Sequence, residues 1–179
     1  KVVRLSETEN LRIFFLSSGG CTYTGPAVPY SEQDEARGTN TYGKHKLRME
    51  SALSESGIGS VILRVANVYG PNQPIGRGQG VVAEWVNSIS RSKPIAIYGD
   101  TSNFRDYIYI DDLLDAIVSL LDSNVTDERF NLGSGKATTL SELRDLFTEL
   151  TKVQIESIRN VPRSSDRQGY FLNISKVYQ

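Results

Sequence analysis

Tyr42 and Lys46 form the pair of residues in this sequence best suited to acid–base chemistry. They begin a segment predicted to be a helix, with Thr39, Asn40 and Thr41 available to cap it. Residues at i and i+4 share one helix face, so we expect the phenol and the ammonium in one site. An ammonium about 5 Å away favours the phenolate, which would let Tyr42 act as a general base. The alternative is a buried tyrosine beside a solvated lysine.

Two predicted parallel strands flank this helix and end in small or polar residues. The apolar run at 13–16 is typical of a strand buried on both faces, and Ser17–Ser18–Gly19–Gly20 follows it. A second strand is predicted over 60–68. A strand, a helix and a strand in succession indicate a parallel β-α-β unit, and such sheets bind ligands at the carboxyl ends of their strands. We therefore expect Ser18 or Thr22, and Asn67, near Tyr42; the alternative for 17–20 is a simple turn.

The rest of the chain alternates short strands and helices. Apolar spacing predicts helices that begin near 81, 111 and 140, the last behind a Thr139-x-x-Glu142 capping box. Strands are predicted at 95–98, 104–110, 130–132 and 155–158. We divide the chain into a partial nucleotide-binding domain at 1–71 and a mainly substrate-binding domain at 72–179, with strand returning to the first domain around 104–135.

Composition indicates a globular protein and excludes several classes of function. The chain has 179 residues and a net charge of −1, so no global field attracts nucleic acid or an acidic membrane. Its one cysteine, Cys21, rules out an intrachain disulfide and favours a reducing compartment, most simply the cytoplasm. The sequence contains no apolar run of transmembrane length, and no His, Cys and carboxylate grouping has metal-ligand spacing.

Several motifs occur in a fixed order along the chain. They are Ser17–Ser18–Gly19–Gly20, Tyr42-x-x-x-Lys46, Arg64–Val65–Ala66–Asn67–Val68–Tyr69–Gly70–Pro71, Arg105–Asp106–Tyr107–Ile108, Asn131–Leu132–Gly133–Ser134–Gly135 and Arg163-x-x-Asp166. In these motifs the sequence resembles the extended short-chain dehydrogenase/reductase family, in particular the nucleotide-sugar epimerase/dehydratase branch that includes UDP-galactose 4-epimerase. The resemblance implies an α/β fold: a Rossmann-like parallel sheet, here only its C-terminal part, with a smaller α/β substrate-binding domain.

The resemblance also implies roles for the residues around Tyr42. Tyr42 occupies the position of the catalytic base, and Lys46 that of the residue that holds the nicotinamide ribose of NAD, or of NADP as the alternative. The partner hydroxyl belongs to Ser18 or Thr22. The resemblance places the remaining cofactor contacts at Ser17, Val65 and Ala66.

Further implied roles concern a nucleotide-sugar substrate, in particular a UDP-sugar. Asn67 matches a residue that contacts the diphosphate, and Arg105 and Arg163 match arginines that clamp it. A strand along the uridine corresponds to Ala96, Ile97 and Tyr98. As alternatives, Arg105 pairs with a neighbouring aspartate and Arg163 is a solvated loop arginine.

Three readings of the function stay open at this point. The first is an NAD-dependent nucleotide-sugar epimerase, as a homodimer. The second is an NADP-dependent sugar-nucleotide reductase. The third is an inactive binding or assembly module, because the family's opening G-x-x-G-x-x-G segment has no counterpart here and the chain reads as N-terminally incomplete. Gly20–Cys21, where dehydratases carry Asp-Glu, argues against dehydration.

Overall fold

The computed structural model describes residues 11–25, 28–76, 80–161 and 169–179. Strands and helices alternate along most of the chain. In order they are β1 (Ile13–Ser18), α2 (Gly19–Thr22), α3 (Thr41–Glu55), β2 (Ser60–Val65), β3 (Asn67–Tyr69), α4 (Val81–Ser90), β4 (Ile95–Tyr98), β5 (Phe104–Arg105), β6 (Tyr107–Tyr109), α5 (Ile110–Asp122), β7 (Glu128–Leu132), β8 (Thr138–Thr139), α6 (Leu140–Thr151), β9 (Ser157–Asn160) and the 3-10 helix η1 (Ser175–Tyr178).

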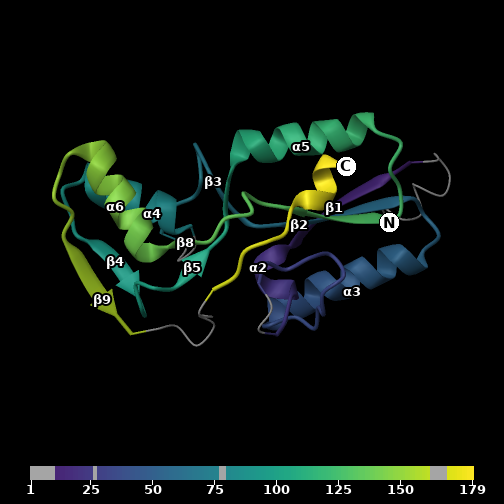
Figure 1. Ribbon diagram of the computed structural model, residues 1–179, viewed down its shortest axis with the longest axis horizontal. Helices are drawn as coiled ribbons and strands as arrows, with labels where there is room; N and C mark the ends of the chain where they lie inside the picture. Colours follow the sequence, from purple (N-terminus) through teal and green to yellow (C-terminus); the bar gives the residue numbers. More distant parts are fainter. Residues whose placement is uncertain (1–10, 26–27, 77–79, 162–168) are drawn as a thin grey trace.

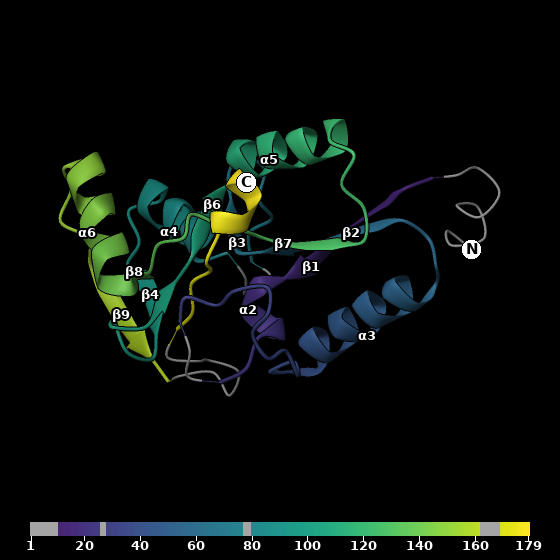
Figure 2. The same ribbon diagram turned by 45° about the vertical axis from the view of Figure 1, so that its right-hand side comes forward.

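The main sheet is parallel and has the strand order β1-β2-β7. Ser18 pairs with Val65, and Val65 pairs with Leu132, so the three strands end at the same edge. Helices α3 and α5 lie on opposite faces of this sheet (Figure 1), and the turned view in Figure 2 shows the same arrangement. The α/β Rossmann-like fold is confirmed.

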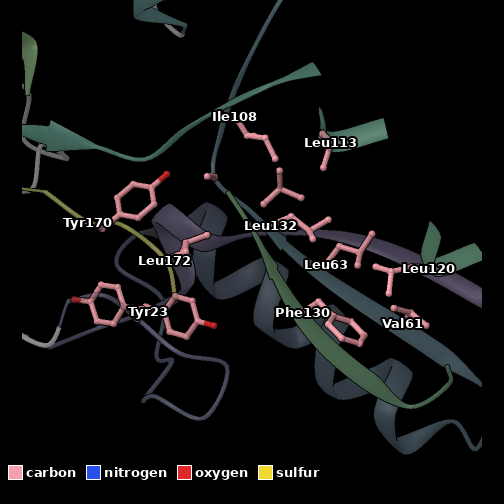
Figure 3. Packing of buried hydrophobic residues seen from close by; sticks show 13 residues of the cluster. Tyr23, Val61, Leu63, Ile108, Leu113, Leu120, Phe130, Leu132, Tyr170 and Leu172 are labelled. Atoms are coloured by element: carbon pink, nitrogen blue, oxygen red, sulfur yellow. The ribbon is translucent and has the colours of Figure 1, made fainter. Parts of the chain in front are cut away.

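The largest apolar cluster lies around β2, which is buried along its whole length as the central strand. Its neighbours in the cluster come from α5, β7 and the C-terminal segment, as Figure 3 shows: Leu113, Leu120, Phe130, Leu132, Tyr170 and Leu172. The apolar run of β1 is less buried than predicted, and Leu16 is 47% exposed. The reason is that, within the described residues, β1 is the edge of the sheet and pairs only with β2.

A smaller unit lies at one end of the molecule, on the left of Figure 1. It contains α4, α6, the parallel pair β4–β9 and the antiparallel pair β5–β8. A second apolar cluster holds it together: Trp85, Ile95, Ile97, Leu143 and Ile155. The predicted capping box begins α6, with Thr139 and Glu142 each bonded to the other's backbone.

Two predicted strands are divided in the structure. The strand predicted over 60–68 breaks at Ala66, whose N–H donates to the Leu132 carbonyl at 2.8 Å. Beyond the break, β3 leaves the main sheet and pairs with β6. The strand predicted over 104–110 likewise splits into β5 and β6, so only β7 returns to the main sheet. None of the helices in the described part of the chain is both long and apolar enough to cross a membrane.

Candidate active site

A cleft of about 850 Å³ opens between the ends of β1 and β2, the start of α3, and the smaller unit. Its lining on the sheet side comes from both strand ends and from the first turn of α3: Ser18, Cys21, Asn40, Tyr42, Ala66 and Asn67. The smaller unit closes the other side with residues of α4, β4 and β5 and their neighbours: Trp85, Ala96, Ile97, Tyr98, Arg105 and Tyr107. The cleft thus lies where parallel sheets are expected to bind ligands.

The start of α3 is fixed by a cap and by a close packing contact. The Asn40 side-chain oxygen accepts a hydrogen bond from the Gly43 N–H at 2.8 Å, as expected for an N-cap. A Cβ on Gly43 would lie 1.9 Å from the Cys21 carbonyl oxygen, so α3 approaches α2 more closely than any other residue would allow. The same oxygen accepts a hydrogen bond from the Thr39 N–H at 2.9 Å.

Tyr42 lies at the edge of the cleft, and Lys46 lies beside it but is not part of the lining. Tyr42 lines it and is 55% exposed. The Lys46 ammonium lies 5.4 Å from the centre of the Tyr42 ring and donates to the Leu16 carbonyl of β1 at 2.7 Å. This geometry excludes the alternative of a buried tyrosine beside a freely solvated lysine.

The structure separates the two candidate partner hydroxyls. Ser18 lines the cleft, whereas Thr22 is fully buried and its hydroxyl donates to the Ser18 carbonyl. The expectation that Thr22 reaches the site is therefore wrong, because the short helix α2 turns this side chain away. Cys21 lines the cleft instead, and the Asn40 side-chain amide donates to its sulfur at 3.7 Å.

Of the three residues implied as further cofactor contacts, one lines the cleft and two do not. Ala66 lines the cleft, at the break between β2 and β3. Val65 belongs to the main apolar cluster, and the Ser17 hydroxyl donates to the buried carboxylate of Glu50, away from the cleft. The side chains of Val65 and Ser17 are therefore structural, because alternate residues of a strand point to opposite sides of the sheet.

Opposite Tyr42, the cleft brings together predicted substrate-binding residues of three strands, β3, β4 and β5. Asn67 donates from its side-chain amide to the Asp106 carbonyl at 3.1 Å, which holds β3 against the turn before β6. Arg105 lines the cleft and donates from Nη1 to the Phe104 carbonyl at 2.7 Å. The predicted uridine strand, Ala96 to Tyr98, lines it as β4. Arg163 lies outside the described residues.

Asp106 points away from the cleft between Arg105 and Tyr107. Its fully buried carboxylate accepts four hydrogen bonds: two from Ser134, one from the Gly135 N–H and one from the Leu172 N–H. Burial raises the pKa of this carboxyl, although the hydrogen bonds act in the opposite direction. Asp106 therefore joins the smaller unit, the turn after β7 and the C-terminal segment.

Sequence reasoning missed two polar groups of the cleft. The Tyr107 hydroxyl and the Gln73 side-chain oxygen are buried and have no hydrogen-bond partner among the described residues. Burial raises the pKa of Tyr107 to about 12, against a smaller opposing effect of Arg105. The alternation of side chains around Arg105 was the available signal for Tyr107, since residues i and i+2 of a strand face the same way.

Comparison with known proteins identifies the family. The profile of the NAD dependent epimerase/dehydratase family matches residues 1–133, which is more than half of the chain. A dTDP-4-dehydro-6-deoxyglucose reductase of Escherichia coli is 35% identical over 171 residues, 93% of this chain and 54% of the relative. A UDP-glucose 4-epimerase of Mycolicibacterium smegmatis is 32% identical over 92% of this chain and 55% of its own.

Solved structures agree in fold with these relatives. A UDP-glucose 4-epimerase of Thermotoga maritima, crystallised with UDP-glucose, has a TM-score of 0.92 and 31% identity, covering 98% of this chain and 59% of its own. A Thermus thermophilus UDP-glucose 4-epimerase in complex with NAD has a TM-score of 0.86 and 25% identity, with coverage of 99% and 60%. The chain spans little more than half the length of these relatives. By its sequence and its fold, the chain belongs to the NAD-dependent epimerase/dehydratase family.

Proposed function

We propose that this chain forms the catalytic and substrate-binding part of an enzyme that epimerises a UDP-sugar with NAD, with Tyr42 as the base. The observation that carries the proposal is the position of Tyr42: half-exposed in the cleft, beside the Lys46 ammonium and the ends of two parallel strands. A phenol that opens onto the cleft can take a hydroxyl proton from a bound sugar as a general base.

The residues at the strand ends fit the nicotinamide end of NAD. The small side chains of Ser18 and Ala66 leave the cleft open beside Tyr42. Lys46, fixed on the Leu16 carbonyl, carries a donor suited to a ribose hydroxyl. When bound there, NAD supplies a hydride acceptor for the sugar carbon and later returns the hydride.

Side chains of the cleft transfer the proton and bind the phosphates. Tyr42 takes the proton of the reacting sugar hydroxyl, and Ser18 donates a hydrogen bond to the same oxygen. Arg105 offers a planar donor fork to the diphosphate, and Asn67 an amide. The Tyr107 hydroxyl has no partner among the described residues, and an acceptor on a ligand that reached it would satisfy it.

A reductase is the second candidate, because the Escherichia coli relative is named as one. Such an enzyme would use the same groups in the opposite sense, with Tyr42 donating a proton to a keto oxygen as the carbon is reduced. The two functions differ in redox balance. Epimerisation returns the nicotinamide to its starting state, whereas reduction consumes one reduced nicotinamide for each sugar.

The test is incubation of the purified chain with NAD and UDP-glucose or UDP-galactose, followed by separation of the products. Epimerised sugar without net change in nicotinamide absorbance supports the proposal. Consumption of NADH or NADPH with a keto nucleotide sugar supports the reductase. Bound UDP-sugar without either product would contradict catalysis by this chain and favour a binding module.

We also propose that the chain forms a homodimer through the outer face of α3. Met49 on this helix is 50% exposed, and Leu16 at the neighbouring sheet edge is similarly exposed. Burial of such apolar area is the usual driving force of association. Sedimentation equilibrium should give twice the chain mass; a monomer would contradict this assembly.

A further inference from the structure

One buried carboxylate contacts a side chain from every strand of the main sheet. Glu50 of α3 accepts a hydrogen bond from the Ser17 hydroxyl of β1 at 2.5 Å. It also accepts two from the Arg64 guanidinium of β2, at 2.7 Å and 3.2 Å. Arg129 of β7 places Nε 3.4 Å from the same carboxylate. Glu50 therefore joins α3 to three adjacent strands at one point.

The ion pair between Glu50 and Arg64 is almost completely dehydrated. Glu50 is 2% exposed and Arg64 is 3% exposed. Burial opposes the charge of Arg64, but the hydrogen bonds to Glu50 and the Coulomb attraction of Tyr23 and Glu50 together outweigh it and raise the pKa of this guanidinium. Replacement of such a buried pair by apolar residues of similar volume is often neutral or stabilising, so stability alone is a weak explanation for the pair.

The position of Glu50 along α3 suggests that reason. Tyr42, Lys46 and Glu50 are four residues apart in succession, so they share one face of the helix. Lys46 is bonded to the carbonyl of Leu16, and Glu50 to the hydroxyl of the next residue, Ser17. Two turns of α3 are thus matched to two consecutive residues of β1. A helix that slid or rotated would lose both contacts together.

We infer that Glu50 is a positioning residue, which fixes the register of α3 on the strands and thereby the placement of Tyr42 in the cleft and of Lys46 beside it. This inference rests on the proposed function for its catalytic consequence. Glu50 does not line the cleft and touches neither ligand site. It acts through directional bonds, which set one helix position where apolar packing would allow several.

The experiment compares three variants of the purified chain. Glu50→Gln keeps the side-chain volume and removes the charge. Glu50→Met combined with Arg64→Met removes both charges of the dehydrated pair, so that Arg64 is not left buried without its partner, while Arg129, whose side chain is 35% exposed, keeps access to solvent. Glu55→Gln is the matched control, because it makes the same substitution at an exposed position of the same helix. Thermal unfolding establishes that each variant is folded.

Two measurements distinguish a role of Glu50 in positioning Tyr42 from a role in the stability of the whole fold. For both Glu50 variants, kcat for UDP-sugar turnover should fall about 100-fold while KM stays unchanged, because the base is misplaced and the substrate contacts are not. Amide hydrogen exchange should become faster over residues 41–47 and stay unchanged in α5, which contacts neither substituted residue. Glu55→Gln should match the wild type in both measurements.

Either readout can overturn the inference. A kcat within about twofold of the wild type in the paired methionine variant would show that Tyr42 keeps its place without Glu50. Faster exchange spread evenly over the sheet would show a general loss of stability instead. Hydrogen exchange does not depend on turnover. It therefore tests whether Glu50 positions the start of α3 even where the wild-type chain proves inactive and the proposed function fails.

Discussion

Lys46, beside the cleft, and Tyr107, in its lining, hold their polar groups in contrasting environments. Lys46 has its ammonium held by a strand carbonyl, which keeps the charge beside Tyr42 instead of in bulk water. Tyr107 has a buried hydroxyl that no described residue satisfies. A buried hydroxyl without a partner costs stability, and such a cost is offset when a ligand accepts the hydrogen bond.

Tyr107→Phe should therefore stabilise the free protein and weaken the complex. Removal of the unpaired hydroxyl is expected to raise the free energy of unfolding by about 1 kcal/mol. Urea unfolding with and without UDP measures both effects, since a ligand stabilises only the folded state that it binds. Tyr178→Phe, at an exposed position, is the control. Destabilisation of the free protein by Tyr107→Phe would contradict an unpaired hydroxyl.

The alkaline limb of the stability curve provides a second check on Tyr107. Its pKa is raised to about 12 in the folded protein by burial, above its ordinary value of 10.0. A raised pKa means that the folded state disfavours the phenolate, so the free energy of unfolding falls as the pH rises from 10.0 to about 12. Tyr107→Phe should lose less stability over that window than the wild type does.

Helix α3 positions Tyr42 because its first turn and one of its faces are fixed. Asn40 caps it, Gly43 lets its first turn approach α2, and Glu50 ties its middle to the sheet. The cap and the shared face of Tyr42 and Lys46 follow from local rules, and the sequence predicts them. The contact of Gly43 with Cys21 does not, since it joins segments more than twenty residues apart.

Gly43→Ala should destabilise the protein, against the usual preference of helices for alanine. Alanine normally stabilises a helix interior by about 1 kcal/mol relative to glycine. Here the new methyl group would overlap the Cys21 carbonyl, and we expect a loss of about 3 kcal/mol as α3 moves outward. Chemical denaturation measures it, with Ser51→Ala at an exposed position of α3 as the control. An unchanged or higher stability would mean that α2 and α3 are not in close contact.

The difference between local rules and tertiary contacts also explains which other predictions from the sequence were confirmed. The β-α-β order, the α6 capping box and the placement of Ser18 and Asn67 at one edge follow from periodicity and topology. The burial of Thr22 and the division of the strands at 60–68 and 104–110 depend on tertiary pairing. Ala66 bonds to Leu132 across the sheet, and no local pattern records that contact.

Each of the two units has its own apolar cluster, and both clusters contribute residues to the lining of the cleft. Asp106 connects the two units through hydrogen bonds. Its carboxylate gathers backbone N–H groups from the turn after β7 and from the C-terminal segment, while its neighbours Arg105 and Tyr107 face the ligand side. A change at Asp106 should therefore affect both units together.

Asp106→Asn should lower the free energy of unfolding by about 3 kcal/mol, because an amide cannot accept all four hydrogen bonds. The pKa of Asp106 is raised by burial, so its own contribution to stability is present at low pH and is lost as the pH rises through that pKa. The deficit of the variant should thus be largest in acid. Asp115→Asn, on the exposed side of α5, is the control, and an equal effect of both substitutions would contradict this role.

The central claim is that Tyr42 transfers the proton while other residues hold the nucleotide sugar. The most direct test is Tyr42→Phe in the purified chain, with UDP-sugar turnover and UDP binding measured on the same sample. We expect turnover to fall by at least about 1000-fold with the dissociation constant for UDP unchanged. Turnover close to that of the wild type would contradict the assignment of Tyr42 as the base and with it the proposed mechanism.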